Sequence, residues 1–222
     1  MKGIIFDFNG TLVFDTHAHE ESWHRLIPTL RDTGFSEEEF RHHVHGHTNQ
    51  EIFSYVFGRE LSQEEGRTYG ELKEAIYRGL LLKDPKTNRL VPGTEAFFDL
   101  LQANAVPMAI ATAAPTENIA FYREQFGLDR WFSKDRIIYA DGTLRGKPHP
   151  AIFNRAIERL GIPASECIIV EDSTLGIRAA QAAGAGRIIG IYPDEGGRIT
   201  LGQWSLFRLI PDFRGMDMSV FD

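Results

Sequence analysis

Short apolar runs and amphipathic segments alternate along most of this chain. One run opens the chain, and from residue 92 onward four more are separated by segments whose apolar residues recur every three or four positions. Short apolar runs predict buried strands, and the spacing of three and four predicts helices with one buried face. The expected strands cover residues 3–8, 107–112, 136–140, 167–170 and 187–192, and the expected helices cover residues 94–104, 116–127, 150–160 and 174–183.

This alternation predicts the fold class. Strands that alternate with amphipathic helices form a parallel sheet with helices on both faces, which is a Rossmann-like, doubly wound α/β fold. Within it, the helix at 116–127 is expected to bury Ile119, Tyr122 and Phe126. From Trp204 onward the pattern predicts one more short helix or strand without deciding between them.

Residues 14–89 interrupt the alternation. They show no strand pattern, and Ser36 with Glu39 three residues later has the spacing of a capping box, which predicts a helix start. The same spacing recurs at Ser62 and Glu65. The expected helical pieces are 16–34, 36–44, 50–55 and 62–82.

Length, charge and cysteine content narrow the class of protein. A chain of 222 residues is long enough for a core domain of residues 1–13 and 90–222 with an inserted α-helical domain of residues 14–89. The formal net charge of -7 argues against a nucleic-acid partner. No signal peptide and no run long enough to span a bilayer is present. Cys167 is the single cysteine, which excludes an internal disulfide, and we expect it to be a core residue of a cytoplasmic protein.

Polar residues follow several of the expected strands. Asp7 lies at the end of the first run, Thr112 closes another, and Glu171 and Asp172 follow a third. The carboxyl ends of parallel strands meet at one edge of a sheet, so these side chains are expected to lie close together. An aspartate there can attack a phosphoryl group, hold Mg²⁺ or cap a turn, and adjacent carboxylates repel each other unless a cation binds.

Lys147 is a candidate because of its neighbours. It stands between Gly146 and Pro148, so it is not on a helix face, and we expect a fixed target such as a phosphate or Asp7. The hydroxyl of Thr112 and nearby backbone N–H groups could hold a phosphate oxygen. The simpler alternatives are a solvated loop lysine, a threonine that caps a helix, and an Asx turn after the fourth run.

The order of these features resembles the haloacid dehalogenase superfamily, close to its β-phosphoglucomutase and phosphoglycolate phosphatase branch. Neither a Walker loop nor a Gly-x-Gly-x-x-Gly fingerprint follows the first strand, which argues against a nucleoside triphosphatase or a dinucleotide-binding protein. The resemblance covers essentially the whole chain, including the insertion, which in this branch is a mobile cap over the active site. The matching stretches are 6–12, 111–112, 146–148 and 170–177.

The resemblance implies a role for each motif residue. Asp7 would be the nucleophile that becomes phosphorylated, and Lys147 would offset its charge. The implied phosphate-binding residues are Thr112, Ala113 and Lys147, and the implied Mg²⁺ ligands are Asp7, Asn9 through its backbone carbonyl, Asp172 and Glu171. Phosphoryl transfer depends mostly on positioning and on neutralising developing charge, which suits these residue types.

Asn9 departs from the family pattern. The family normally has a second aspartate two residues after the first, and that carboxylate moves the proton. An amide cannot do so, and general acid–base help is worth roughly 10²–10⁴-fold in rate. We therefore expect metal and phosphate binding to survive with slow turnover, unless another group substitutes. The sequence does not distinguish a natural variant from an engineered one.

The inserted domain offers candidate substrate contacts. His19 and Trp23 share one helix face at i, i+4, and resemble a histidine and tryptophan that face the substrate in the phosphoglucomutase relatives. The relatives also use a cap lysine and a loop that reads the substrate; Asn49 stands where the mutases have an arginine for a second phosphate. The alternatives are a core tryptophan and a solvated lysine. The full set is His19, Trp23, Thr48, Asn49 and Lys73.

Histidines are concentrated in the same domain. They could indicate a zinc or nickel site, but pairs at i, i+2 diverge on a helix, so we expect solvated or satisfied polar roles. The histidines concerned are His17, His19, His42, His43, His45 and His47.

The sequence predicts a Mg²⁺-dependent phosphatase that acts on a small phosphomonoester, such as a sugar phosphate, through an aspartyl phosphate. It predicts no nucleic-acid or membrane partner and a monomer or weak dimer. The alternatives are a phosphosugar mutase, which Asn49 disfavours, and a phosphate-ligand-binding protein of low turnover, which Asn9 favours. A phosphoacceptor receiver domain also uses a strand-end aspartate, but the long insertion argues against that class.

Overall fold

The computed structural model describes residues 2–44 and 47–222, and His45 and Gly46 of the histidine-rich segment lie outside the described residues. The chain divides into two compact units, each described by itself. The first unit contains Met1–Phe14 and Arg89–Asp222, and the second contains Asp15–Asn88.

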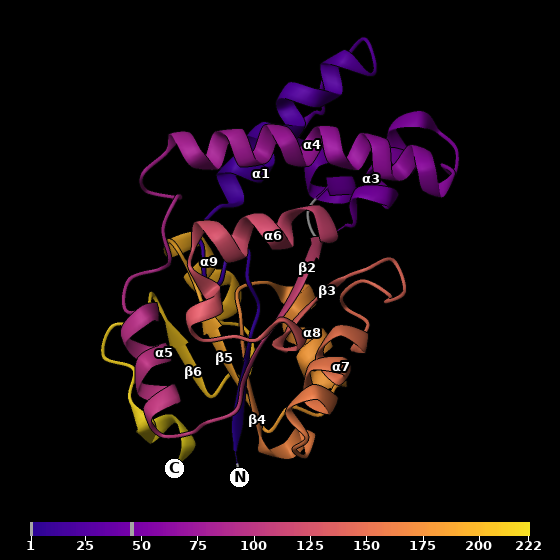
Figure 1. Cartoon of the computed structure of the whole chain (residues 1–222). Helices are drawn as coiled ribbons and strands as arrows, with labels where there is room; N and C mark the ends of the chain where they lie inside the picture. Colours follow the sequence, from indigo (N-terminus) through magenta and orange to yellow (C-terminus); the bar gives the residue numbers. More distant parts are fainter. Residues whose placement is uncertain (1, 45–46) are drawn as a thin grey trace. The chain divides into compact units, whose positions relative to one another are not determined.

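The first unit is built on one six-stranded parallel sheet (Figure 1). Its strand order is β3-β2-β1-β4-β5-β6, so the chain runs outward from β1 in one direction and then returns to build the other half. The order therefore reverses between β1 and β4, which is where ligands bind in open α/β sheets. The strands are β1 (Gly3–Phe6), β2 (Met108–Pro115), β3 (Ile137–Ala140), β4 (Cys167–Glu171), β5 (Arg187–Ile191) and β6 (Arg208–Ile210).

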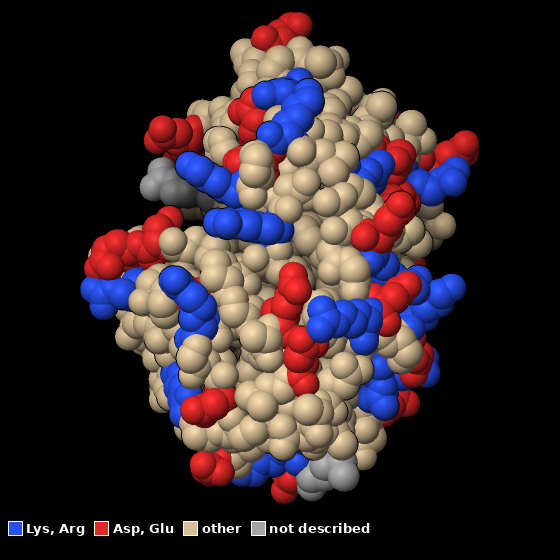
Figure 2. All heavy atoms as spheres, turned by 60° about the vertical axis from the view of Figure 1, so that its left-hand side comes forward, with Lys and Arg blue, Asp and Glu red and all other residues tan. Residues whose placement is uncertain are grey.

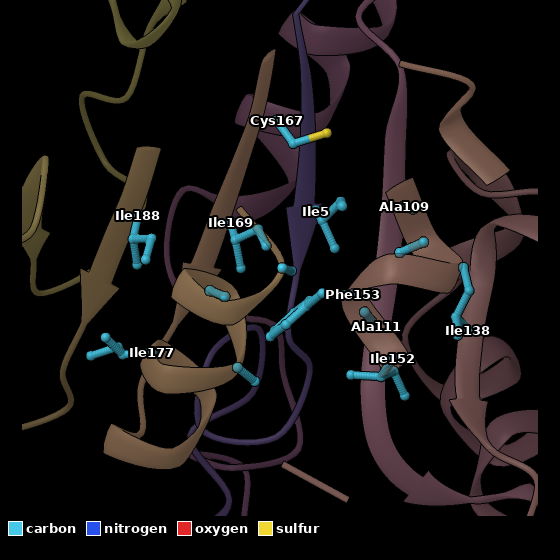
Figure 3. Close-up of a cluster of buried hydrophobic side chains, with 14 of the residues drawn as sticks. Ile5, Ala109, Ala111, Ile138, Ile152, Phe153, Cys167, Ile169, Ile177 and Ile188 are labelled. Carbon is cyan, nitrogen blue, oxygen red and sulfur yellow. The ribbon is translucent and has the colours of Figure 1, made fainter. Parts of the chain in front are cut away.

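Helices cover both faces of this sheet. Alternate residues of a strand point to opposite faces, and β1 shows both: Ile5 packs with Phe153 and Ile177 in one apolar cluster (Figure 3), whereas Phe6 contacts the edges of Phe97 and Phe98. The predicted doubly wound α/β core is confirmed. The helices are α5 (Thr94–Ala103), α6 (Thr116–Gln125), α7 (Ala151–Leu160), α8 (Thr174–Ala182) and α9 (Glu195–Leu201).

Two sequence expectations for this unit need correction. The predicted strand at 107–112 extends to Pro115. The buried face of α6 carries Asn118 with Tyr122, while Ile119 is only half-buried. Cys167 is buried in the core, as predicted.

The second unit is helical, and no strand occurs among the residues of it that are described. Its apolar cluster includes Trp23, Ile27 and Phe53. The α-helices in its described residues are α1 (Thr16–Leu26), α2 (Glu37–Glu39), α3 (Asn49–Phe57) and α4 (Gln63–Lys83).

The helix boundaries of the second unit agree with the sequence prediction in some places and differ from it in others. The two predicted capping boxes form at Ser36 and Ser62. The predicted helix at 16–34 is wrong in length, because α1 ends at Leu26 and a 3₁₀ turn at Ile27–Thr29 follows. Pro28 lies in that turn, and proline has no N–H with which to continue an α-helix. The predicted helix at 36–44 is a short α-helix followed by a π-helix at Phe40–Val44.

The surface carries charges of both signs. On the face drawn in Figure 2, acidic and basic side chains lie interspersed. Among the residues that the structure describes, no helix combines the length and apolar character that crossing a membrane needs.

Candidate active site

Asp7 follows β1 at the carboxyl edge of the sheet. Its backbone N–H donates to the carbonyl of Val170 over 3.0 Å, which continues the pairing of β1 with β4 by one residue. The Asp7 carboxylate is buried, and its Oδ1 accepts a hydrogen bond from Lys147 Nζ over 2.6 Å. The sheet therefore fixes the backbone of Asp7, and Lys147 fixes its side chain.

Lys147 joins the ends of two neighbouring strands. Besides Asp7, it donates to Glu171 at the end of β4, and both ion pairs are largely shielded from solvent. Burial alone would lower the pKa of Lys147, but the charges of Asp7 and Glu171 outweigh it and raise that pKa above its usual value. Lys147 is thus a permanent cation at this edge, with the fixed target that its sequence context predicts.

Glu171 is held from two sides. Its second oxygen accepts from the backbone N–H of Ser173 over 2.8 Å and from the Ser173 hydroxyl over 2.9 Å. Gly176 in α8 passes so close that a Cβ there would overlap the Glu171 carboxylate. This side chain is therefore rigid, and it orients Lys147 as well as adding negative charge.

Asp172 completes an acidic group. Carboxylate oxygens of Asp7, Glu171 and Asp172 lie within 4.8 Å of one another, the one such group of three metal-ligand residues found among the described parts of the chain. Thr11 Oγ1 donates to Asp172 over 3.0 Å, and Gly10, with φ of 79°, leaves room for the Asp172 carboxylate where a Cβ would collide with it.

The electrostatics of this group fit a cation. Burial, and then the charges of Glu171 and Asp7, raise the pKa of Asp172 well above its usual value. Among these three clustered carboxylates, Asp7 and Glu171 are bonded to the cation Lys147. Oxygen donors with excess negative charge suit a hard divalent cation.

Thr112 and Asn9 lie beside one another. Thr112 is buried near the end of β2, and its hydroxyl donates to Asn9 Oδ1 over 3.3 Å while accepting from the backbone N–H of Ala114 over 3.0 Å. Ala113, which lies between Thr112 and Ala114 in the sequence, is exposed. The amide nitrogen of Asn9 donates to the hydroxyl of Tyr122 over 2.9 Å.

Several residues of this site were not identified as site residues from the sequence. Thr11 orients Asp172, and Ser173 orients Glu171. Both lie within the stretches 6–12 and 170–177 that resemble the family motifs, and this position was the signal that could have identified them. Asn118 donates to the Tyr122 hydroxyl over 3.3 Å. An asparagine four residues before a buried tyrosine on one helix face gave only a weak signal.

A second polar group is buried within the helical unit. Lys73 Nζ lies 2.6 Å from His19 Nδ1 and 2.9 Å from Glu74 Oε1, and Glu74 accepts from Asn49 Nδ2 over 2.8 Å. The ammonium group of Lys73 also lies 5.5 Å from the centre of the Trp23 ring. Four of the five candidate substrate residues of this unit are thus close neighbours.

Tyr77 and Asp15 extend the same group. The ring of Tyr77 stacks on His19 with centroids 3.9 Å apart, and its hydroxyl donates to Asp15 over 2.5 Å. Burial would raise the pKa of Glu74, but the charge of Lys73 lowers it to about 2. Lys73, which the sequence alone allowed to be solvated, is buried here in an ion pair with Glu74.

The fifth candidate, Thr48, has a local role. Its side chain accepts a hydrogen bond from the backbone N–H of Glu51, and the Glu51 carboxylate accepts one from the backbone N–H of Thr48. The two bonds form a capping box at the start of α3. His43 stacks on Tyr55 with centroids 3.8 Å apart.

The doubly wound sheet, with an acidic group where the strand order reverses, is that of a Rossmann-like α/β enzyme. The chain belongs to the haloacid dehalogenase-like hydrolase family, because the model of that family matches residues 1–184. The fold, the family and the general expectation of a hydrolase are therefore confirmed.

Individual relatives are similar over most of their length. The crystal structure of a HAD hydrolase, family IA, variant 3, from Entamoeba histolytica superposes with a TM-score of 0.88 at 34% identity, and the match covers 100% of this chain and 97% of that one. A phosphorylated carbohydrates phosphatase from Thermotoga maritima is 23% identical over 86% of this chain and 85% of its own. Hexitol phosphatase A from Escherichia coli is 28% identical, with 82% and 80% covered.

Proposed function

We propose that this protein is a Mg²⁺-dependent phosphatase that hydrolyses a small phosphomonoester, such as a sugar phosphate, through an aspartyl phosphate on Asp7. The observation that carries the proposal is the Asp7 carboxylate at the reversal of strand order, 2.6 Å from Lys147 and next to Glu171 and Asp172. The names of the phosphatases to which the chain is similar support the same substrate class.

In the first half of the reaction, an Asp7 oxygen forms a bond to phosphorus while the bond from phosphorus to the substrate oxygen breaks. The substrate oxygen leaves with the electron pair and takes a proton from solvent, because Asn9 cannot donate one. Lys147 holds the carboxylate in place and offsets the charge that builds up on the transferred group, while Thr112 and the backbone at Ala113 bind phosphate oxygens. Mg²⁺, held by Asp7, Asp172, the backbone carbonyl of Asn9 and, directly or through water, Glu171, would neutralise phosphoryl oxygens when bound.

In the second half, water releases the phosphate from Asp7. Asn9 cannot accept a proton from that water, so this half is expected to be slow. A second candidate function follows from the same observation: a protein that binds a phosphoester with Mg²⁺ and turns it over poorly. Both functions use the same ligands, and they differ only in rate.

The helical unit is proposed to recognise the substrate. His19 and Lys73 are the residues we assign to this contact, with Trp23 behind them. Asn49 is bonded to Glu74 and has no guanidinium with which to bind a second phosphate, which favours hydrolysis over mutase chemistry. We further propose a cytoplasmic monomer or weak dimer without a nucleic-acid or membrane partner.

Phosphate release from a panel of sugar phosphates and other small phosphomonoesters tests the proposal. The protein should hydrolyse some of them with Mg²⁺, and neither Asp7→Ala nor excess EDTA should leave activity. If the protein shows no more activity than Asp7→Ala on the whole panel, the phosphatase proposal is wrong.

Asn9→Asp separates the two candidates. A gain of about 10²-fold or more would assign the slow step to the amide and favour the low-turnover function. A protein that is already fast and gains little would show that another group assists the water.

A further inference from the structure

Two buried polar side chains of α6 are linked to Asn9 by hydrogen bonds, Tyr122 directly and Asn118 through Tyr122. Asn118 and Tyr122 are separated by one helical turn and share a face, and their exposed fractions are 0% and 2%. Buried polar groups are costly unless they are hydrogen-bonded. Asn9 Nδ2 donates to the Tyr122 hydroxyl over 2.9 Å and Asn118 Nδ2 donates to it over 3.3 Å.

These bonds fix both ends of the Asn9 amide. A hydroxyl oxygen has two lone pairs, and the two amide donors occupy those of Tyr122. At the other end, Thr112 already accepts from the backbone N–H of Ala114, so its own proton is directed to Asn9 Oδ1. The amide nitrogen is thus held toward α6, and the amide oxygen is held toward the implied phosphate-binding threonine.

The ring of Tyr122 is itself immobilised. It stacks on Phe8, the residue before Asn9, with centroids 4.2 Å apart and planes 23° apart, and it also packs against Phe126. Close packing of this kind leaves a side chain little rotational freedom. The hydroxyl that receives the Asn9 amide therefore has a fixed position.

We propose that Tyr122 and Asn118 form a hydrogen-bonded socket that orients Asn9, so that the oxygen of its amide positions the water that attacks the aspartyl phosphate. The proposal rests on the phosphatase function proposed above. Tyr122 and Asn118 are positioning residues, whereas Asn9 contacts the reacting water. An amide oxygen can orient an attacking water without taking its proton.

The step balances without a base at residue 9. The water oxygen forms a bond to phosphorus, the bond from phosphorus to the Asp7 oxygen breaks, and its electron pair returns to the Asp7 carboxylate. One proton of the water passes to the departing phosphate, which leaves as dihydrogen phosphate. In this step the amide of Asn9 orients the water and takes no proton from it.

The first test is a double-mutant cycle that does not depend on activity. Urea unfolding of the wild type, Asn9→Ala, Tyr122→Phe and the double variant should show coupling of about fivefold in the unfolding equilibrium constant. Tyr192→Phe, in a tyrosine that follows β5 two strands from β1, is the matched control and should be additive with Asn9→Ala. Asn118→Ala with Asn9→Ala provides a second cycle.

The second test is the kinetics of the same variants with Mg²⁺ and the best substrate of the panel. Tyr122→Phe should lower kcat about tenfold with little change in KM, and it should lower kcat no further once Asn9 is alanine. Tyr192→Phe should leave both constants unchanged. Additive losses in kcat would overturn the water-positioning role, because Tyr122 would then act on stability alone.

The outcomes separate this proposal from the proposed function. Additive stabilities in both cycles would overturn the socket. Coupled stabilities without Mg²⁺-dependent hydrolysis in any variant, Asn9→Asp included, would overturn the phosphatase and with it the role of the water, while the socket would stand.

Discussion

The acidic group at the sheet edge and the polar group around Lys73 show opposite electrostatics. At the sheet edge, carboxylates repel each other, and the pKa of Asp172 is raised by burial and by its acidic neighbours. In the helical unit, Lys73 lowers the pKa of Glu74 against the effect of burial. A group whose charges repel is expected to gain stability from an added cation, whereas a group whose charges attract is stabilised by its own residues. This contrast separates a candidate metal site from a polar group whose own charges balance each other.

Lys147→Met should have the largest effect. It removes the cation bonded to Asp7 and Glu171, so turnover should fall by roughly 10³-fold and the free energy of unfolding by about 3 kcal/mol in EDTA. Phosphate release and urea unfolding measure the two losses. Millimolar Mg²⁺ should restore part of the stability, and the contrast between the groups breaks down if it restores none.

Lys73→Met makes the corresponding change in the helical unit. It leaves Glu74 buried without its lysine, so stability should fall by about 3 kcal/mol, and Mg²⁺ should not restore it. The pKa of Glu74 is lowered from 4.5 in its unperturbed state to about 2, so the stabilisation is present above pH 4.5 and is lost as pH falls toward 2. Urea unfolding at pH 7, 4 and 3 should therefore show the two proteins converging in acid. A constant difference would contradict the assignment of this pair.

The effect of Asp172→Asn on stability should change sign when a divalent cation is added. Without divalent ions it removes a repelling charge, so at pH 7 it should raise the melting temperature of the protein. The pKa of Asp172 is raised above 3.8, so its ionisation opposes folding as pH rises, and the advantage of the variant should vanish below about pH 4. Added Mg²⁺ should stabilise the wild type more than the variant. Thermal unfolding with EDTA or Mg²⁺ measures both, and equal responses to Mg²⁺ would remove Asp172 from the proposed ligands.

Ser173→Ala should have the smallest effect. Its hydroxyl caps α8 by accepting from the backbone N–H of Gly176, and it also donates to Glu171. Loss of an N-cap costs about 1 kcal/mol. The cost should be the same with and without Mg²⁺, because the backbone N–H of Ser173 still holds Glu171. A loss that depends on Mg²⁺ would instead place Ser173 in the metal site.

The sheet edge could be predicted from sequence because its geometry is a property of the fold. Once the alternation of strands and helices implies a parallel sheet, Asp7, Thr112 and Glu171 must meet at the carboxyl edge, however far apart they are along the chain. Lys147 was identifiable because glycine and proline exclude it from a helix face. The metal and phosphate roles of these residues remain predictions.

The helical unit was predicted less completely because its polar group depends on how three helices, α1, α3 and α4, pack together. Nothing local to Lys73 and Glu74 distinguishes a solvated helix face from a buried ion pair. Asp15 gave no signal at all. The length of α1 was mispredicted because the apolar pattern continues past Pro28. The backbone of that proline lacks the N–H that an α-helix needs in order to continue.

The central position of β1 has a consequence for how the chain is made. Gly3–Phe6 is synthesised before the other strands of the sheet, and it pairs with β2 and β4, which begin at Met108 and Cys167. Ribosomes add about 5–20 residues per second, so the most apolar strand of the sheet waits several seconds for its first partner. During that interval the helical unit, which has its own apolar cluster, can form around local contacts. The strand that carries the proposed nucleophile is therefore the segment for which a chaperone on the nascent chain would matter most.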